Sequence, residues 1–417
     1  MSPLLKLALL LAGALLISRI SWRPRFAAAG VTLLIGLGTH FLAVGVLLGP
    51  VTGILSREVV QALAPFLMLG LGWVGMLMGM QLDREQLRQF SSRLPLATVT
   101  QGFLAFAVAW VLAWAIVELL GLADSAWSPW GPAILTLCAV TAVSAPAAVA
   151  LVASRFRARG PVSRLLMYVA SLDGLVGIAA LAVVVSLYRG SAGSGIGVDD
   201  PWLRLGLLAA AGLLSGLLFV SLTRAKPSAE ELVLFLGGTV LFASGIAYAL
   251  ELSPLAVCLI GGAVVANASR FRGRVYAMLA SWEKPIYGIL LVLAGAMLRP
   301  PDWWVAPLVL LLLAVRLIAK LFAAWAAVRI VAARDVPRRL GLGLFANGGL
   351  ALAIVINYAL NYGSHAGAES AVVDTVFAAV VLAVAVTELA GPWVLKNVLA
   401  RAGELGGTGN AAVAAGT

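Results

Sequence analysis

Long apolar runs without a single charge constrain this chain more than any other feature. Leu94 to Val117 contains no charged side chain, and neither does Leu205 to Leu222. A helix needs roughly 20 apolar residues to cross about 30 Å of hydrocarbon. Only 11% of the 417 residues are charged, whereas a soluble globular chain is about a quarter charged. We therefore expect an all-α integral membrane protein with the lipid bilayer as its surroundings.

Apolar windows and their breakers predict about thirteen transmembrane helices. The N-terminal apolar stretch lacks a small-residue cleavage site, so we interpret it as the first helix and not as a secretory signal. After Arg401 the chain is rich in Gly and Ala, and we expect this end to be disordered. The predicted spans are 3–20, 27–50, 59–82, 95–121, 131–153, 163–188, 202–222, 231–250, 253–269, 284–299, 303–328, 338–361 and 371–395, followed by a short tail at 396–417.

The basic residues alternate with the spans. Of the 29 Lys and Arg residues, 22 lie in the loops after odd-numbered spans or in the C-terminal tail, and five lie on the opposite side. The remaining two, Arg316 and Lys320, lie within a span. This asymmetry places the N-terminus outside and the C-terminus in the cytoplasm. It also accounts for the net charge of +11 without a nucleic-acid partner.

The sequence shows no signature of a soluble enzyme. Cys138 and Cys258 lie in apolar runs without CxxC or Cys/His spacing, which supports neither a disulfide nor a zinc site. Neither a GxGxxG nor a Walker motif is present, and no Ser, His and Asp residues form a credible triad. We predict no catalytic residue and no cofactor, so any transport would have to be driven by ion gradients.

The fifth predicted span is poorly built as one continuous helix. Pro146, near its centre, removes a backbone donor and crowds the preceding turn. Thr141 and Ser144, just before it, can satisfy backbone groups that the interruption frees. The simplest alternative is that the proline only permits close packing, as small or irregular residues often do in membranes.

The twelfth predicted span carries a second interruption, Asn347-Gly348-Gly349. The two interrupted spans are seven apart, an odd number, so they cross the membrane in opposite directions. Paired interruptions in oppositely oriented halves are the best sequence indication of an inverted-repeat transporter with a site near the bilayer midplane. The helix ends exposed there carry partial charges, positive at N-termini and negative at C-termini.

The same offset of seven spans divides the chain. We predict a first repeat at 1–188, a linker span at 202–222 and a second repeat at 231–395. The expected core of each repeat is its last three spans, 95–188 and 303–395.

Few ionisable groups lie deep within the spans. Asp173 falls near the middle of the sixth span, where a charge costs at least about 2.5–3.5 kcal/mol. A carboxylate withdrawn from water favours its protonated form, and its oxygens can also ligate a monovalent cation. One group that holds either a proton or a cation, never both, is a minimal antiport device. Arg316 and Lys320, four apart on one helical face, are the expected counter-charges.

Two further groups are secondary candidates. Glu388 in the last span could contact a transported ion or form a structural ion pair, and His40 could be a proton relay or a hydrogen-bonded packing residue. For Asp173 itself the alternative is a purely structural buried ion pair.

Several segments resemble the monovalent cation:proton antiporter superfamily, specifically its bacterial sodium/hydrogen-exchanger-like members. The resemblance covers essentially the whole chain. The segments that carry it are 43–50 (AVGVLLGP), 79–83 (GMQLD), 252–255 (LSPL) with Gly261-Gly262, and 387–392 (TELAGP).

The resemblance implies a site at the crossing of two broken helices, beside an acidic pair in the sixth span. Here that pair reads Leu172-Asp173, so only the second acid is present. The family's basic residue of the eleventh span corresponds to Lys320 or Arg316, and spacing does not decide which. A Gly-Glu that often follows the second break is Gly348-Gly349 in this chain.

The resemblance also implies a bacterial plasma membrane location, a homodimer and an elevator-like movement of the core. The leading hypothesis is exchange of sodium or potassium for protons through the single Asp173. Alternatives on the same scaffold are a channel-like pathway, another substrate, or a sensory or structural subunit. The sequence identifies no soluble partner chain.

Overall fold

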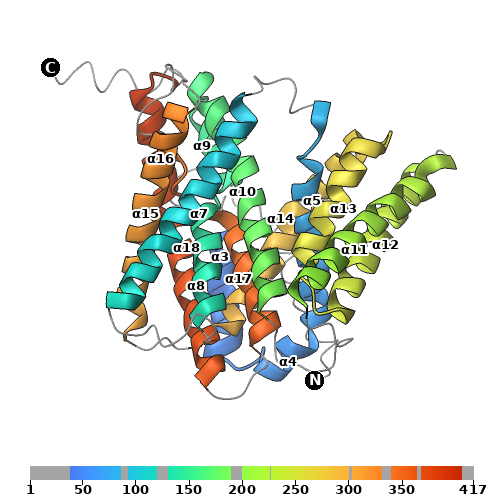
Figure 1. Cartoon of the computed structure of the whole chain (residues 1–417), viewed down its shortest axis with the longest axis horizontal. Coiled ribbons are helices and arrows are strands. Elements are labelled where there is room, and N and C mark those ends of the chain that lie inside the picture. The colour runs from blue at the N-terminus through green and yellow to red at the C-terminus, as the bar shows by residue number, and fades with distance from the viewer. Residues whose placement is uncertain are drawn as a thin grey trace.

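The structure is a computed structural model, and it describes eight stretches of the chain. These are residues 38–85, 93–119, 130–188, 200–225, 227–299, 303–330, 340–363 and 368–405. Within them the chain forms helices and no strand, which confirms the all-α prediction (Figure 1). The helices are α3 (Thr39–Val46), η1 (Leu47–Val51), α4 (Arg57–Ala62), α5 (Ala64–Met80), α7 (Arg93–Leu119), α8 (Trp130–Ala142), α9 (Pro146–Arg155), α10 (Pro161–Leu187), α11 (Pro201–Leu222), η2 (Thr223–Ala225), α12 (Ala229–Ala249), α13 (Pro254–Ala268), α14 (Arg272–Met297), α15 (Val305–Ile330), α16 (Leu340–Gly343), α17 (Gly348–Tyr362) and α18 (Ala368–Arg401).

Many of these helices can cross a bilayer. In the described stretches, eight helices are long and apolar enough to do so, and four shorter apolar helices accompany them. The predicted span 3–20 and the first part of span 27–50 lie outside the described residues. The count of thirteen therefore stays a prediction.

The tenth span begins earlier than predicted. The sequence indicated a helix from residue 284, but α14 begins at Arg272 and runs without interruption to Met297. Residues 272–284 contain several charges and were interpreted as a loop for that reason. Most of that first part is exposed or half-buried, so its charged side chains are compatible with a helix.

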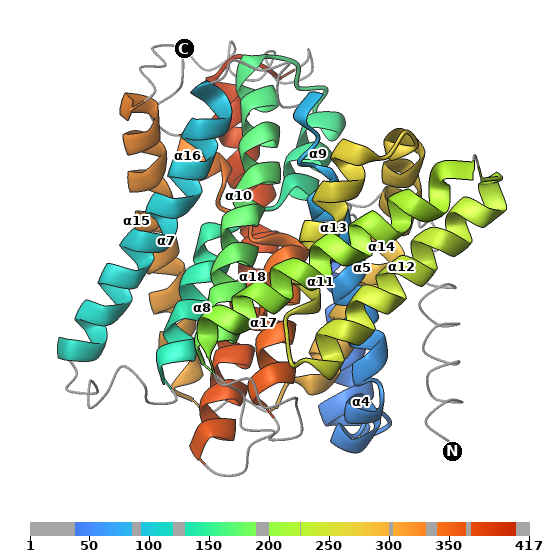
Figure 2. The same cartoon turned by 45° about the vertical axis from the view of Figure 1, so that its right-hand side comes forward.

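The helices form two groups (Figures 1 and 2). In one group, α5 packs against α13, which also packs against α11, and α3 packs against α14. Glycines allow the close approach of α5 and α13: a Cβ on Gly75 would lie 2.2 Å from the Leu255 carbonyl oxygen, and one on Gly79 would lie 2.1 Å from that of Leu259. In the other group, α7 packs against α15 and α8 against α10.

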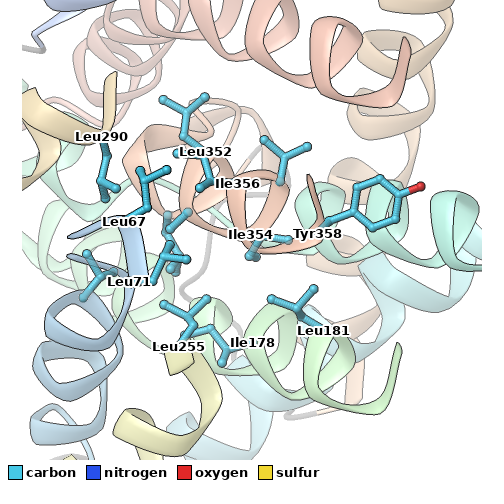
Figure 3. Packing of buried hydrophobic residues seen from close by; sticks show 14 of the residues in the cluster. Leu67, Leu71, Ile178, Leu181, Leu255, Leu290, Leu352, Ile354, Ile356 and Tyr358 are labelled. Atoms are coloured by element: carbon cyan, nitrogen blue, oxygen red, sulfur yellow. The ribbon is translucent and has the colours of Figure 1, made fainter. Parts of the chain in front are cut away.

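The helix α17 joins the two groups. Its apolar side chains are almost entirely buried, and it packs against α5 and α14 on one side and α8 and α10 on the other. Figure 3 shows Leu352, Ile354 and Ile356 of this helix among side chains from α5, α10, α13 and α14. The main apolar cluster is therefore continuous across the boundary between the groups.

Both predicted interruptions are real breaks in helices. The chain leaves helical geometry between α8 and α9 and again between α16 and α17. Pro146 is the first residue of α9, a position where its missing N–H leaves no hydrogen bond unmade. Figure 1 shows α9 and α16 toward the end of the molecule that carries the C-terminus, with α8 and α17 toward the other end. The two broken helices thus run in opposite directions.

The chain beyond Arg401 is not wholly disordered, contrary to our expectation. Glu404 turns back onto the first turn of α10 and is 9% exposed. Its carboxylate accepts hydrogen bonds from Val162 N (2.6 Å) and Ser163 N (2.8 Å). A carboxylate satisfies the free N–H groups of a helix N-terminus and interacts favourably with the helix dipole. Residues 406–417 lie outside the described part.

Removing this carboxylate should loosen the end of α10. We expect Glu404→Ala to lower the free energy of unfolding by about 1–2 kcal/mol, as the loss of a helix cap does. The measurement is thermal unfolding of the purified protein in detergent. Arg401→Ala, an exposed change nearby, is the matched control and should leave the midpoint unchanged. Equal midpoints for the two variants would contradict a capping role.

Candidate ion site at the helix crossing

Asp173 lies on α10 and is fully buried at 0% exposure. The break between α8 and α9 supplies its hydrogen-bond donors. Ser144 N donates to Asp173 Oδ1 at 3.0 Å, and Ser144 Oγ donates to Asp173 Oδ2 at 2.6 Å. Since Ser144 lies in the extended segment just before α9, the carboxylate sits near the positive N-terminal end of that half-helix. The interruption therefore creates the donors that hold the acid.

Lys320, on α15, is the counter-charge of Asp173. Its Nζ lies 2.8 Å from Asp173 Oδ2. The same ammonium donates to the carbonyl of Ala142 at 2.6 Å and to Ser144 Oγ at 2.8 Å. Its three N–H donors thus meet three acceptors, although the side chain is fully buried. A buried ion pair persists only with such additional hydrogen bonds.

Arg316, one turn before Lys320, has a different role. Among the described residues it forms no hydrogen bond or ion pair with Asp173. Its five N–H groups instead make six hydrogen bonds of 2.8–3.2 Å to main-chain carbonyls, so one N–H is shared between two acceptors. Three acceptors belong to the first break and three to the second: Val140, Thr141, Val143, Leu344, Phe345 and Ala346. Because helix C-termini carry partial negative charge, one guanidinium compensates the ends of α8 and α16 together.

The two breaks also touch each other directly. Ala145 N donates to the Ala346 carbonyl at 3.0 Å. Gly348 begins α17 with a positive φ of 71°, and a Cβ there would lie 2.6 Å from the Ala145 Cβ. Only glycine meets both demands without strain, so Gly348 is fixed by the crossing itself. Its neighbour Gly349 lies against the ring of Tyr287, where a Cβ would come within 2.5 Å.

The remaining predicted residues lie apart from the Asp173 carboxylate. The Thr141 hydroxyl donates to the Leu137 carbonyl at 2.8 Å within its own helix, so only its main-chain carbonyl takes part, through Arg316. Asn347 precedes α17 and is 1% exposed, and its Oδ1 has no partner in the described chain. Glu388 is buried on α18. His40 stacks on Phe41 in α3, a helix that packs against α14.

A cavity of about 920 Å³ opens elsewhere between the two helix groups. Its lining includes Gln61, Glu251 and the ion pair of Arg299 with Asp374. Asp173 is not among the lining residues, and Val185 is the residue that α10 contributes. Since Val185 lies 12 residues beyond Asp173, the two are about 18 Å apart along the helix.

Sequence reasoning missed the carbonyl acceptors. Apart from Thr141, the acceptor residues are alanine, valine, leucine and phenylalanine, which carry no polar side chain that could mark them. The available signal was the breaks, because each helix C-terminus leaves carbonyls without intrahelical partners, and a buried arginine has five N–H groups to satisfy them.

Comparison with known proteins decides the family. The model of the sodium/hydrogen exchanger transmembrane family matches residues 26–401. The chain belongs to this family. It is a family of membrane transporters, in agreement with the resemblance inferred from the sequence.

Solved structures share the fold. One is described as the sodium proton antiporter MjNhaP1 from Methanocaldococcus jannaschii at pH 8, with 16% identity, coverage of 97% of this chain and 99% of that chain, and a TM-score of 0.68. An electron-microscopy map of the same antiporter gives 17% identity, coverage of 95% and 96%, and a TM-score of 0.59. None of the curated proteins matches the sequence.

The six-carbonyl arrangement predicts that Arg316 cannot be replaced by another cation. Arg316→Lys keeps the charge, but an ammonium has three donors on one nitrogen and cannot reach both breaks. Because several buried carbonyls would lose their donor, we expect a loss of about 3 kcal/mol or more in the free energy of unfolding. Thermal unfolding in detergent measures this loss, with Arg329→Lys at the end of α15 as the matched control. A midpoint equal to that of the control would contradict the proposed role.

Proposed function

We propose that this chain exchanges a monovalent cation, sodium or potassium, for protons, and that Asp173 is the single acid through which it does so. The observation that carries the proposal is a fully buried carboxylate at the crossing of two broken helices, held by Ser144 and neutralised by Lys320. Membership of the sodium/hydrogen exchanger family supports it.

The geometry suggests how cation and proton would compete. In the described arrangement the Lys320 ammonium takes the place at Asp173 Oδ2 that a cation would need. A cation that enters can use the Asp173 and Ser144 oxygens only if Lys320 moves away. A proton on Asp173 would also remove the attraction to Lys320. Either occupant neutralises the acid, so the two exclude each other, which is the requirement for exchange.

To carry an ion across the membrane, the site around Asp173 has to become accessible from each side in turn. Lys320, Arg316, both breaks and α10 are linked by hydrogen bonds into one unit. The cavity between the helix groups is lined by residues of α4 and the end of α17, elements that lie toward the end of the molecule opposite the C-terminus. We expect the unit to move as a body against the other helices of a homodimer in a bacterial plasma membrane, with the N-terminus outside and the C-terminus in the cytoplasm.

A second candidate function is a channel-like or non-exchanging subunit. Leu172 favours it, because this side chain, buried at 4% exposure beside Asp173, offers no polar group to an ion. Proteoliposomes separate the two functions: an exchanger collapses a preset pH gradient when sodium or potassium is added, whereas a channel responds to voltage without such coupling.

Asp173→Asn should abolish exchange and leave the fold intact. The amide can still accept from Ser144, but it can neither hold a negative charge nor release a proton. We expect cation-dependent collapse of a pH gradient in proteoliposomes to fall at least 100-fold. Asp83→Asn is the control, since Asp83 is a buried acid that pairs with Arg272 away from the crossing. Near-normal flux in Asp173→Asn would reject the proposal.

A site with one titrating acid should trade one proton for one cation, so membrane voltage should not affect turnover. Lys320 could change this outcome, because a lysine that loses its proton during the cycle would carry a second charge. In the described state its ammonium donates to three acceptors, one of which is Asp173. The measurement is sodium-driven proton movement in proteoliposomes clamped with potassium and valinomycin. A steep voltage dependence that Lys320→Gln removes would identify the lysine as a second proton carrier.

A further inference from the structure

Glu388 is a second buried acid, and its surroundings do not compensate it. It lies in α18 and is 5% exposed. Its Oε2 has no hydrogen-bond partner, and no ion pair includes it in the described part of the chain. The two buried cations nearest the crossing are engaged elsewhere, Lys320 with Asp173 and Arg316 with carbonyls. A buried carboxylate without a counter-charge is costly enough that it is expected to bind a positive ion or a proton.

The position of Glu388 places it at the second break. Gly391, one turn further along α18, lies on the break itself: a Cβ there would come within 2.8 Å of the Ala346 Cβ. Residues three apart on a helix share a face, and the buried residues Val384 and Leu395 continue that face on either side. Glu388 therefore lies on the side of α18 that faces the crossing.

The two halves of the fold share one arrangement, a broken helix followed by a long helix that carries a buried acid. In the first half, the broken helix α8–α9 is followed by α10, which brings Asp173 back to the level of the break. In the second half, α16–α17 is followed by α18. The chain leaves the first break along α9, which has 10 residues, and the second break along α17, which has 15. A longer part of α18 is therefore needed to bring the chain back to the level of its break. Glu388 lies one turn before Gly391, the residue of α18 that meets the break, and we take it as the counterpart of Asp173 in the second half.

Of the helix ends at the crossing, the N-terminal end of α17 is the one without a charged side-chain partner among the described residues. Arg316 compensates the C-terminal ends of α8 and α16, and Asp173 lies at the N-terminal end of α9. The N-terminal end of α17 begins at Gly348, and Asn347 before it makes no side-chain cap. Asn347 Oδ1, a second buried acceptor, is also without a donor. On α14, Tyr287 interacts electrostatically with Glu388, and Glu283 lies one turn before it. Within the described residues, no Lys or Arg side chain forms an ion pair with Glu388.

We propose that Glu388 forms a second ion site at the break between α16 and α17, which takes up a proton or a monovalent cation separately from Asp173. The class of ion rests on the proposed function, whereas the existence of the site rests on the geometry of Glu388. The two carboxylates belong to equivalent helices of the two halves, and only Asp173 has a built-in cation. Glu388 must obtain its positive charge from solution.

The experiment uses the full-length protein in detergent with Asp173 already disabled. Asp173→Asn is compared with the double variant Asp173→Asn/Glu388→Gln. Potentiometric titration without sodium counts the protons that each variant binds, and thermal unfolding compares sodium chloride with choline chloride at equal ionic strength. We expect the single variant to hold one more proton than the double variant near neutral pH, where an ordinary glutamate is ionised. A rise in its unfolding midpoint with sodium, absent in the double variant, would assign the site to a cation as well.

Identical proton counts together with identical sodium responses would overturn the proposal. If the double variant does not fold, infrared difference spectra of Asp173→Asn between low and high pH provide the second test. A carboxyl band that changes position in Asp173→Asn/Glu388→Asp supports the site, and spectra that do not differ overturn it. Failure of the proposed function would be seen elsewhere, as exchange by Asp173→Asn in proteoliposomes.

Discussion

The hydrogen bonds from Arg316 to both breaks are the interaction on which the rest of the site depends. Two interrupted helices expose carbonyl groups in a region without water, where each unsatisfied group costs several kcal/mol. One guanidinium reaches six of these carbonyls. It can do so because the breaks touch each other, through Ala145 and Ala346. The close contact in turn requires glycine at position 348. The hydrogen bonds of Arg316, the contact between Ala145 and Ala346 and the glycine at position 348 thus depend on one another.

With the carbonyls satisfied, Lys320 is free to pair with Asp173. The two cations lie one turn apart on α15, yet one has a structural partner set and the other has a titratable partner. Arg316 therefore holds the two breaks together, whereas Lys320 is the partner of the acid proposed for ion exchange. If Arg316 were also the counter-charge of Asp173, each binding event would disturb the carbonyls that hold the crossing together. In the exchange proposed above, Lys320 is the partner that moves, while the carbonyls of both breaks keep Arg316 as their donor.

The sequence predicted the helices, both interruptions and the charged residues in the spans, because each is a local departure from an apolar pattern. It could not assign Arg316 and Lys320, since their shared helical face is compatible with either contact to Asp173. The choice depends on where the carbonyls at the C-terminal ends of α8 and α16 meet, and five of the six residues that supply them are apolar. The early start of α14 and the fold-back of Glu404 were missed for a related reason. Charged and small residues indicate that a segment is exposed to solvent. An exposed segment can still be a helix, as in the first part of α14, or an ordered turn, as at Glu404.

In each half of the chain a broken helix is followed by a long helix that carries a buried acid, and the two acids have different partners. Each half brings an acid from the helix after its break back toward that break, Asp173 in α10 and Glu388 in α18. The first acid has two donor groups of Ser144 and a lysine as partners, whereas Oε2 of the second has no hydrogen-bond partner among the described residues. A shared scaffold explains why both are buried at the crossing. Under the two proposals, this difference in partners means that Asp173 exchanges its occupant against Lys320, whereas Glu388 takes its positive charge from the surrounding solution.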